Sequence, residues 1–343
     1  MRCSKNSQKK HAILIERINF ERGALEVIIK LLEPLRVPDA LIEKLARPLE
    51  KAGHKFVYYK EKTTNVEELA ERSEDADIVV IANNPYPKRA FQHAENLKLI
   101  NVAFTGVDHV DQQAAKAQNI QIANAAGYSN TAVAELVLGL TLDVLRKISF
   151  GNQSVRLGEE VSIIQGNEIK GKTVGIIGTG NIGLEAARLF KAFGAELIGY
   201  NRSEKESAKE LGLDYVSLDD LLQKSDIVSV HLPLNNETTH LLSKEKLALM
   251  KSEAILINAA RGPIIDNKAL AELLNEEKIA GAGIDVFDEE PPLSEDYPLL
   301  TAKNAVLTPH VAYLTDEAMV TRAQIAFENI EKFIAGNPQN IVQ

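Results

Sequence analysis

The sequence has 343 residues, of which 45% are hydrophobic and 25% are charged. This length exceeds one typical domain and the composition is ordinary for a globular protein, so we expect about two domains, each with its own core. The net charge of −9 provides no basic excess, which excludes nucleic acid as a bulk partner. The single cysteine, Cys3, excludes a disulfide framework within the chain and favours a reducing compartment, the cytoplasm.

The sequence shows no signal for a membrane. Residues 1–18 are basic but contain no apolar stretch of the secretory type, and residues 5–10 are expected to be a solvated tail. The most apolar later segment, residues 132–145, contains Glu135 and Asp143 and is too short to span a bilayer. We therefore predict a cytoplasmic protein without a membrane partner.

Residues 12–124 alternate between apolar strand patterns and helical patterns. Strands are predicted at residues 12–15, 55–58, 77–82, 97–103 and 120–123, and one of the helices at residues 39–52, bounded by Pro38 and Gly53. This alternation predicts a parallel sheet with helices on both faces. The turn at Thr105 and Gly106 follows a strand end, where open α/β sheets hold their ligands.

The pattern changes at residue 124. Residues 124–130 read as a loop, and residues 131–148 as one long helix whose apolar positions spread over more than one face. We expect this helix to join two domains and to contribute to a subunit contact.

The strongest signal is a strand–turn–helix–strand unit at residues 171–203. The turn between the strand at 173–177 and the following helix reads Gly178-Thr179-Gly180-Asn181-Ile182-Gly183. The first glycine allows a tight reversal, the second lets a diphosphate approach the backbone, and the third lets helix and strand pack closely. The free N–H groups at the start of the helix attract an anion. The unit therefore predicts a dinucleotide site.

The remaining residues complete a second sheet. Further strands are predicted at residues 196–200, 226–231, 254–258, 281–285 and 305–308, and helices at residues 243–250, at 267–277 after Asp266 as N-cap, and at 315–335 before Gly336. The fold class is therefore α/β, with two doubly wound parallel-sheet domains. The final helix is expected to return to the first domain. Residues 1–124 and 311–343 would then form a flavodoxin-like substrate-binding domain, and residues 125–310 an inserted Rossmann cofactor domain.

Four more motifs follow in order along the chain. They read His231-Leu232-Pro233-Leu234, Asn258-Ala259-Ala260-Arg261-Gly262, Asp285-Val286-Phe287-Asp288-Glu289-Glu290-Pro291 and Thr308-Pro309-His310. With residues 103–108, 124–135 and 171–183, they resemble the D-isomer-specific 2-hydroxyacid dehydrogenases over residues 100–343, whereas the first hundred residues match only in general pattern. The resemblance implies hydride transfer between a nicotinamide cofactor and a small 2-keto or D-2-hydroxy acid.

The resemblance also implies three catalytic residues. Arg261 follows a strand end, where its guanidinium can hold a substrate carboxylate in a charge-assisted pair. Glu290 would orient His310 and stabilise its imidazolium. His310 would then protonate the carbonyl oxygen in reduction and deprotonate the hydroxyl in oxidation.

Other residues receive supporting roles. We assign Asp285 to the nicotinamide carboxamide, with a local loop contact as the alternative. The backbone N–H groups of Thr105 and Gly106 would bind the substrate carboxylate. His231 is expected near the ribose or diphosphate, with Pro233 shaping its turn, or else to be structural. No metal-binding motif is present, so no metal is expected.

One position departs from the commonest NAD-binding pattern. Asn201 and Arg202 stand about where an acidic residue usually binds the ribose 2′-hydroxyl. Without that carboxylate, Arg202 can pair with a 2′-phosphate, so NADP(H) is expected to be accepted, although Glu204 and Glu206 oppose this.

Several functions within the family stay open. Asn201 and Arg202 favour a glyoxylate or hydroxypyruvate reductase, while 3-phosphoglycerate dehydrogenase and D-lactate dehydrogenase are alternatives. An NADH-sensing corepressor-like binding protein is the alternative of a different class, and turnover on keto acids would separate it from an enzyme. A homodimer is expected. The sequence leaves the substrate and the physiological direction open.

Overall fold

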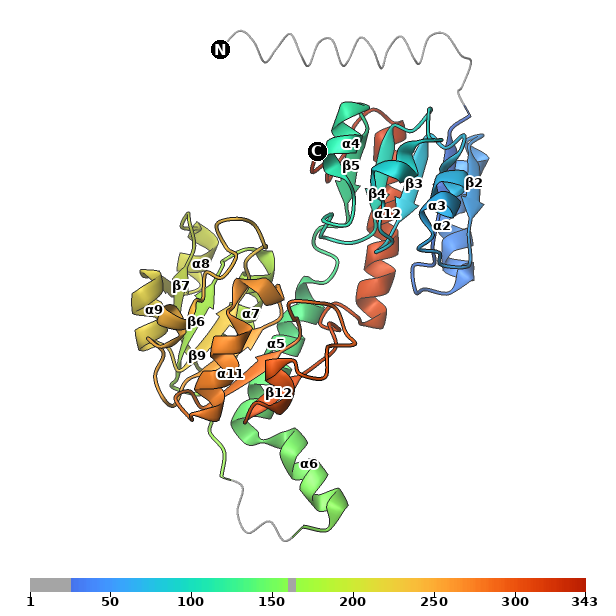
Figure 1. Ribbon diagram of the computed structural model, residues 1–343. Helices are drawn as coiled ribbons and strands as arrows, with labels where there is room; N and C mark the ends of the chain where they lie inside the picture. Colours follow the sequence, from blue (N-terminus) through green and yellow to red (C-terminus); the bar gives the residue numbers. More distant parts are fainter. Residues whose placement is uncertain (1–25, 160–164) are drawn as a thin grey trace. The chain divides into compact units, whose positions relative to one another are not determined.

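The computed structural model describes residues 26–159 and 165–343, which form two compact units (Figure 1). Unit 1 comprises the described residues up to Tyr128 together with Asp316–Gln343, and unit 2 the described residues of Ser129–Thr315. The sequence predicts these boundaries after residues 124 and 310.

Unit 1 is built on a five-stranded parallel sheet. Its strands are β1 (Ile28–Leu31), β2 (Lys55–Tyr58), β3 (Ile78–Ile81), β4 (Leu99–Val102) and β5 (Gln121–Asn124). They lie in the order β2-β1-β3-β4-β5, which is the flavodoxin-like order that the sequence predicts. Every residue of β3 and β4 is buried, as expected for strands covered on both faces.

Helices cover both faces of this sheet. They are α2 (Asp39–Lys51), α3 (Val66–Ser73), η1 (Lys88–Phe91), α4 (Gln112–Ala117) and α12 (Asp316–Ile334). The side chains of Asn65 and Asp111 cap α3 and α4 by accepting backbone N–H groups of their first turns. The C-terminal helix α12 packs against α2 and β4, and the Asn101 Nδ2 donates to the Ala326 carbonyl at 2.7 Å.

The first strand of this sheet differs from the prediction. The predicted strand at residues 12–15 and the predicted tail at 5–10 lie outside the described residues. The sequence predicts no strand at β1, because Lys30 interrupts a run of only four residues. Lys30 is nevertheless 8% exposed, and its Nζ lies 2.6 Å from the Asp75 carboxylate. A lysine paired at its tip therefore fits inside a short buried strand.

Unit 2 is built on a seven-stranded parallel sheet. Its strands are β6 (Thr173–Ile177), β7 (Glu196–Tyr200), β8 (Leu213–Tyr215), β9 (Ile227–Val230), β10 (Ile255–Asn258), β11 (Gly281–Ile284) and β12 (Ala305–Leu307). The order β12-β11-β10-β9-β6-β7-β8 is the Rossmann order extended by one strand. The sequence predicts six of these strands and misses β8, which is a three-residue edge strand with Asp214 exposed in its middle.

The helices of unit 2 correct two expectations. They are α5 (Asn130–Arg146), α6 (Ile148–Leu157), α7 (Asn181–Ala192), α8 (Glu206–Glu210), α9 (Leu218–Lys224), α10 (Lys244–Leu247) and α11 (Asn267–Asn275), with short 3₁₀ turns at Gly262–Ile264 and Pro298–Thr301. The single helix predicted at 131–148 is wrong at its end, because Lys147 adopts a left-handed conformation (φ 54°) that stops α5 and starts α6. The helix predicted at 243–250 is only the single turn α10.

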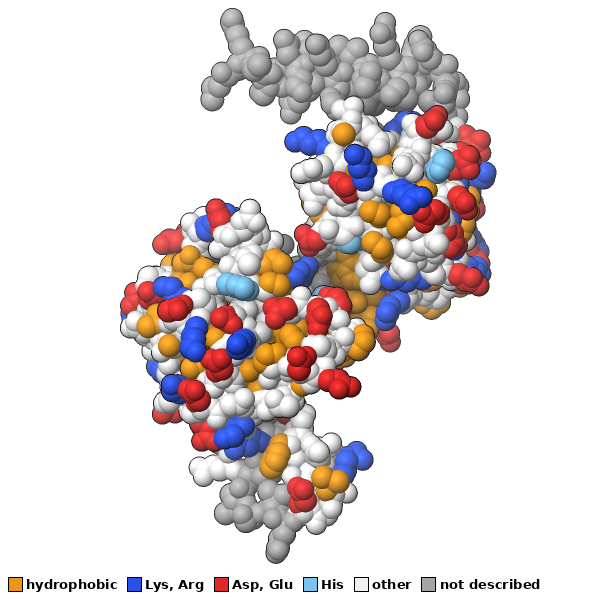
Figure 2. Space-filling view, in the orientation of Figure 1, with side chains coloured by type: hydrophobic (Ala, Val, Ile, Leu, Met, Phe, Trp, Pro, Cys, Tyr) orange, Lys and Arg blue, Asp and Glu red, His pale blue; other side chains and the backbone are white. Residues whose placement is uncertain are grey.

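Helix α6 carries exposed apolar side chains, visible in orange in Figure 2. Ile148 and Val155 are 56% and 79% exposed, and Phe150 and Leu157 are 56% and 64% exposed. The seven-residue spacing places the two members of each pair on the same face of the helix. The two-residue offset between the pairs places them on opposite faces. Both faces of α6 are therefore apolar surface in the single chain.

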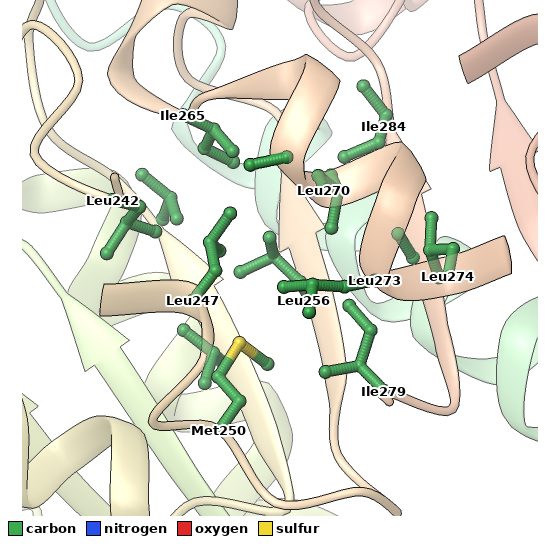
Figure 3. Close-up of a cluster of buried hydrophobic side chains, with 14 of the residues drawn as sticks. Leu242, Leu247, Met250, Leu256, Ile265, Leu270, Leu273, Leu274, Ile279 and Ile284 are labelled. Carbon is green, nitrogen blue, oxygen red and sulfur yellow. The ribbon is translucent and has the colours of Figure 1, made fainter. Parts of the chain in front are cut away.

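The core of unit 2 supports its loops. Figure 3 shows a cluster in which Leu256 of β10 and Ile284 of β11 pack with Leu242, Leu247 and Leu270, all fully buried. Each such side chain stabilises the fold by roughly 1.5–3 kcal/mol relative to exposure. The strands that lead to the candidate site are thus packed against buried aliphatic side chains.

None of the helices in the described ranges is long and apolar enough to cross a membrane.

Candidate active site

The predicted cofactor and catalytic residues of unit 2 follow the carboxyl ends of its strands. Because all strands are parallel, these ends share one edge of the sheet, where doubly wound folds bind ligands. From one side of the sheet to the other, the segments along this edge carry His310 after β12, Glu290 after β11, Arg261 after β10, His231 after β9, the glycine-rich turn after β6 and Asn201 after β7.

His310 and Glu290 form a pair. The His310 Nδ1 lies 2.7 Å from Glu290 Oε1 and 3.0 Å from Oε2, so the Nδ1–H is donated to the carboxylate. The Tyr313 ring meets the imidazole edge-on, with 5.7 Å between centroids. A proton exchanged with a ligand would therefore pass through Nε2, which makes the pair suitable for general acid–base chemistry.

The loop that carries His310 is fastened by Asp285. The Asp285 side chain is fully buried and accepts the Thr308 hydroxyl at 2.6 Å and the backbone N–H groups of Val311 and Ala312, both at 2.9 Å. The backbone of His310 is left-handed (φ 53°), and its N–H donates to the Asp285 carbonyl. Asp285 thus has a structural role that the sequence offers only as an alternative, and its contact with a carboxamide stays a prediction.

Arg261 is held by a buried asparagine. The fully buried Asn258 ends β10, and its Nδ2 donates to the Arg261 carbonyl at 3.0 Å while its Oδ1 accepts the Ala260 N–H at 3.0 Å. The Arg261 Nη1 donates to the Ala260 carbonyl, so one of the guanidinium N–H groups is used within the same turn. The motif contains Asn258, but the sequence alone assigns it no role.

A second polar network joins the Arg261 turn to the segment before Glu290. Asn267 Nδ2 donates to the Gly262 carbonyl at 3.2 Å and to the Asp288 carboxylate at 2.9 Å, and the Tyr297 hydroxyl donates to the same carboxylate at 2.9 Å. Burial raises the pKa of Tyr297, so it stays a donor. A Cβ on Gly262 would lie 1.9 Å from the Phe287 carbonyl oxygen, so the two segments touch through backbone. No sequence signal identified Asn267 or Tyr297 in advance.

The glycine-rich turn has the geometry that the sequence predicts. Gly178 has φ 97°, and a Cβ on Gly183 would lie 2.0 Å from the Gly178 carbonyl oxygen, so both positions require glycine. A Cβ on Gly180, in contrast, would meet no atom within 4 Å. Helix α7 starts at Asn181, directly after this open space, with Ile182 in its first turn. Backbone N–H groups with free space before them suit a diphosphate.

The loop after β7 carries Asn201 and Arg202. The Asn201 Nδ2 donates to the Ser203 carbonyl at 2.7 Å. The Arg202 guanidinium pairs with the Glu237 carboxylate at 2.9 Å, and both side chains are exposed, at 79% and 71%. The sequence does not indicate Glu237, which belongs to the loop after β9.

His231 and Pro233 follow β9. The His231 Nε2 lies 2.8 Å from the Ser229 hydroxyl, and burial lowers the pKa of His231 to about 4. The ring is therefore neutral near pH 7 and brings no positive charge to a diphosphate. The Pro233 carbonyl accepts the Thr238 hydroxyl at 2.6 Å. A Cβ on Gly178 would lie 2.6 Å from the His231 carbonyl oxygen, so this segment backs the glycine-rich turn.

Thr105 and Gly106 belong to unit 1, so the sheet of unit 2 does not bring them to the residues above. They follow β4, at the carboxyl edge of their own sheet. Asn124 Nδ2 donates to the Thr105 carbonyl at 2.8 Å, which ties this turn to the end of β5.

Comparison with known proteins extends these observations. Residues 138–312 match the model of the D-isomer specific 2-hydroxyacid dehydrogenase NAD-binding domain. The chain is 40% identical over 313 residues to D-3-phosphoglycerate dehydrogenase of Methanocaldococcus jannaschii, covering 89% of this chain but only 58% of that protein. It is 34% identical over 304 residues to hydroxypyruvate reductase of Blautia hydrogenotrophica, covering 86% and 93%.

A solved structure agrees with these matches. The acyclic imino acid reductase Bsp5, in complex with NADPH and D-Arg, superposes with a TM-score of 0.82 at 31% identity, covering 92% of this chain and all of that one.

The fold, the glycine-rich turn and the acid–base pair define a nicotinamide-dependent oxidoreductase. The chain belongs to the D-isomer specific 2-hydroxyacid dehydrogenase family and uses NAD(P)(H). The predicted family, fold class and cofactor are thereby confirmed.

Proposed function

We propose that the protein reduces small 2-keto acids, hydroxypyruvate or glyoxylate, to D-2-hydroxy acids. The observation that carries the proposal is the His310–Glu290 pair in the segments after β12 and β11, next to β10, whose end leads to Arg261. The relative named hydroxypyruvate reductase supports the choice of substrate, because the match covers 93% of its length.

The bound cofactor supplies the hydride, and the residues of the chain hold the substrate and move the proton. Arg261 binds the keto-acid carboxylate through its guanidinium. His310 gives the Nε2 proton to the carbonyl oxygen as negative charge develops there. Glu290 keeps the ring oriented by accepting its Nδ1–H.

For the cofactor we propose that residues 178–183 receive the diphosphate and that Asn201 and Arg202 lie at the adenosine ribose. The open space at Gly180 supports this placement. NADP(H) is accepted, because no carboxylate stands at Asn201 or Arg202 to repel a 2′-phosphate. The engagement of Arg202 by Glu237 makes the preference for NADP(H) weak.

Unit 1 is proposed to bind the substrate and unit 2 the cofactor. We also propose a homodimer, in which a second copy covers α6. Its exposed apolar pairs on two opposite faces support this, since such surface is costly to leave in water. The single cysteine supports a cytoplasmic location. Light scattering of the purified chain tests the dimer, and a monomer at micromolar concentration would contradict it.

A substrate panel tests the proposed reaction. We expect kcat/KM to be highest for hydroxypyruvate or glyoxylate, with both NADH and NADPH supporting turnover. Pyruvate or a phosphorylated 3-carbon substrate as the best substrate would favour the D-lactate or D-3-phosphoglycerate branch instead. Nucleotide binding without turnover on the whole panel would overturn the enzymatic assignment.

A further inference from the structure

One tyrosine hydroxyl joins two loops of unit 2 that are far apart in sequence. The Tyr215 hydroxyl, at the end of β8, lies 2.7 Å from the Thr179 hydroxyl in the glycine-rich turn. The same oxygen accepts the backbone N–H of Lys205 at 3.0 Å, at the far end of the loop after β7. Thr179 is fully buried, so this contact lies inside the protein behind the turn.

With these contacts, both ends of the loop of residues 201–205 are fixed to the glycine-rich turn. Its near end is fixed to the turn by the sheet itself, because the Gly178 N–H donates to the Tyr200 carbonyl at 2.8 Å. Its far end is fixed by Tyr215. Lys205 is the N-cap residue of α8, and its backbone N–H donates to the Tyr215 hydroxyl.

The fixed spacing affects dinucleotide binding because, in the proposed site, the two loops bind different parts of one extended ligand. A diphosphate at the turn and an adenosine ribose at residues 201–203 are covalently joined, so both loops must keep a fixed spacing to bind them together. Holding the loops in place before binding reduces the entropy lost on association. A tie between them therefore acts on the affinity for the dinucleotide rather than on the chemical step.

We propose that Tyr215 is a positioning residue for the dinucleotide, acting by holding the 201–205 loop against the glycine-rich turn through Thr179 and Lys205. The proposal rests on the cofactor site proposed above. Tyr215 touches neither reacting atom in this role, and its effect is transmitted through the two loops.

The test is Tyr215→Phe in the full chain, which removes the hydroxyl and keeps the ring. We expect the Kd for NADH and NADPH, measured by fluorescence titration, to rise about tenfold, which corresponds to one net hydrogen-bond contribution. The kcat at saturating cofactor should stay within about twofold of wild type, because the acid–base pair is untouched. Thr179→Val should give a similar rise and Thr179→Ser should restore tight binding. Both substitutions remove the same contact, so their effects should not add. The Kd of the double variant Tyr215→Phe with Thr179→Val should therefore lie within about twofold of the Kd of either single variant.

Tyr86→Phe is the matched control. It removes the hydroxyl of a fully buried side chain, bonded to Ser73 at 2.7 Å in unit 1, and should lower Tm without changing either Kd. If Tyr215→Phe behaves like this control, with a lower Tm and an unchanged Kd, the proposal is overturned. Thr179→Val supplies the same readout should Tyr215→Phe fail to fold. Wild-type turnover on the keto-acid panel decides the proposed function separately, whatever the variants show.

Discussion

The two halves of the carboxyl edge of the unit 2 sheet, which carries the candidate site, are fixed by different kinds of contact. After β10, β11 and β12, buried polar side chains fix the loops: Asn258 holds the Arg261 turn, and Asp285 holds the His310 loop with three hydrogen bonds. After β6, glycine and backbone contacts set the geometry, with a Cβ on Gly183 falling 2.0 Å from the Gly178 carbonyl oxygen. Tyr215 is the main side-chain tie in that half.

The difference follows from what each half presents. A catalytic imidazole or guanidinium must be aimed, so its backbone needs clamps that do not depend on its own side chain. A turn that offers backbone N–H groups to an anion needs the opposite, because side chains would obstruct the approach. Substitutions should therefore have distinct signatures: changes in kcat on the β10–β12 side and changes in cofactor affinity on the β6–β7 side.

The largest expected effect is that of His310→Gln. Glutamine cannot act as an acid near neutral pH, so kcat should fall by about 10²–10⁴-fold. In the proposed mechanism the imidazole contacts the substrate and not the phosphates, so cofactor Kd should stay within about twofold. Steady-state rates together with fluorescence titration check both statements. A variant that keeps half of the wild-type kcat would refute the role of His310.

His231 lies after β9, where the two halves meet, and predicts a pH dependence of stability. Burial lowers the pKa of its imidazole from 6.5 to about 4. The folded state binds this proton less readily than the unfolded state, so stability is complete above about pH 6.5 and is lost as the pH falls towards 4. The loss amounts to about 3 kcal/mol. Urea unfolding at pH 7 and pH 4.5 should show a smaller difference for His231→Asn than for wild type. Equal pH dependence in both proteins would contradict the lowered pKa of His231.

Asp285→Asn tests the clamp of the catalytic half. In the wild type, each carboxylate oxygen accepts one of the backbone N–H groups of Val311 and Ala312. Asparagine has only one side-chain oxygen, so its NH₂ group would face the other N–H. That buried donor would stay unpaired, at a cost of about 1–3 kcal/mol. The His310 loop should shift, so kcat should fall about 10–100-fold. Cofactor Kd should change less than kcat. The reverse split would indicate that Asp285 acts mainly on the nicotinamide.

Gly180→Ala tests the nucleotide half. The new methyl group meets no protein atom within 4 Å, and the backbone of Gly180 (φ −69°, ψ −172°) is open to alanine, so Tm should not fall. The methyl group would occupy the approach of the diphosphate, and cofactor Kd should rise about tenfold or more. Gly183→Ala is the contrasting control, because its Cβ would strike backbone and should lower Tm as well. If Gly180→Ala leaves the cofactor Kd unchanged, the proposed position of the diphosphate at this turn is wrong.

The sequence predicts the elements of this molecule where local pattern and tertiary structure agree. Strands β6, β7 and β10 consist mainly of apolar residues, and the glycine spacing at 178–183 has a steric cause that is visible in the sequence. Strand β1 was missed because Lys30 is stabilised by Asp75, which is distant in sequence. The break between α5 and α6 depends on one left-handed lysine.

The candidate site was predictable to the same extent. The residues that we propose act on a ligand, such as Arg261 and His310, stand in motifs after strand ends. The residues that brace them, such as Asn267 and Tyr297, have partners from 5 to 21 positions away. Their roles arise only when the loops meet, so no spacing in the sequence identifies them.

The smallest expected effect concerns the choice between the two cofactors. Glu237 pairs with the Arg202 guanidinium and so competes with a 2′-phosphate for it. Because both side chains are exposed, the pair is weak, and Glu237→Gln should raise kcat/KM for NADPH only about two- to fivefold while leaving that for NADH unchanged. Glu204→Gln is the matched control, since that carboxylate pairs with Lys209 at 2.7 Å and should alter neither value as much. If Glu237→Gln leaves the NADPH to NADH ratio at the wild-type value, Arg202 does not receive the 2′-phosphate, and the nucleotide half would select its cofactor by backbone alone.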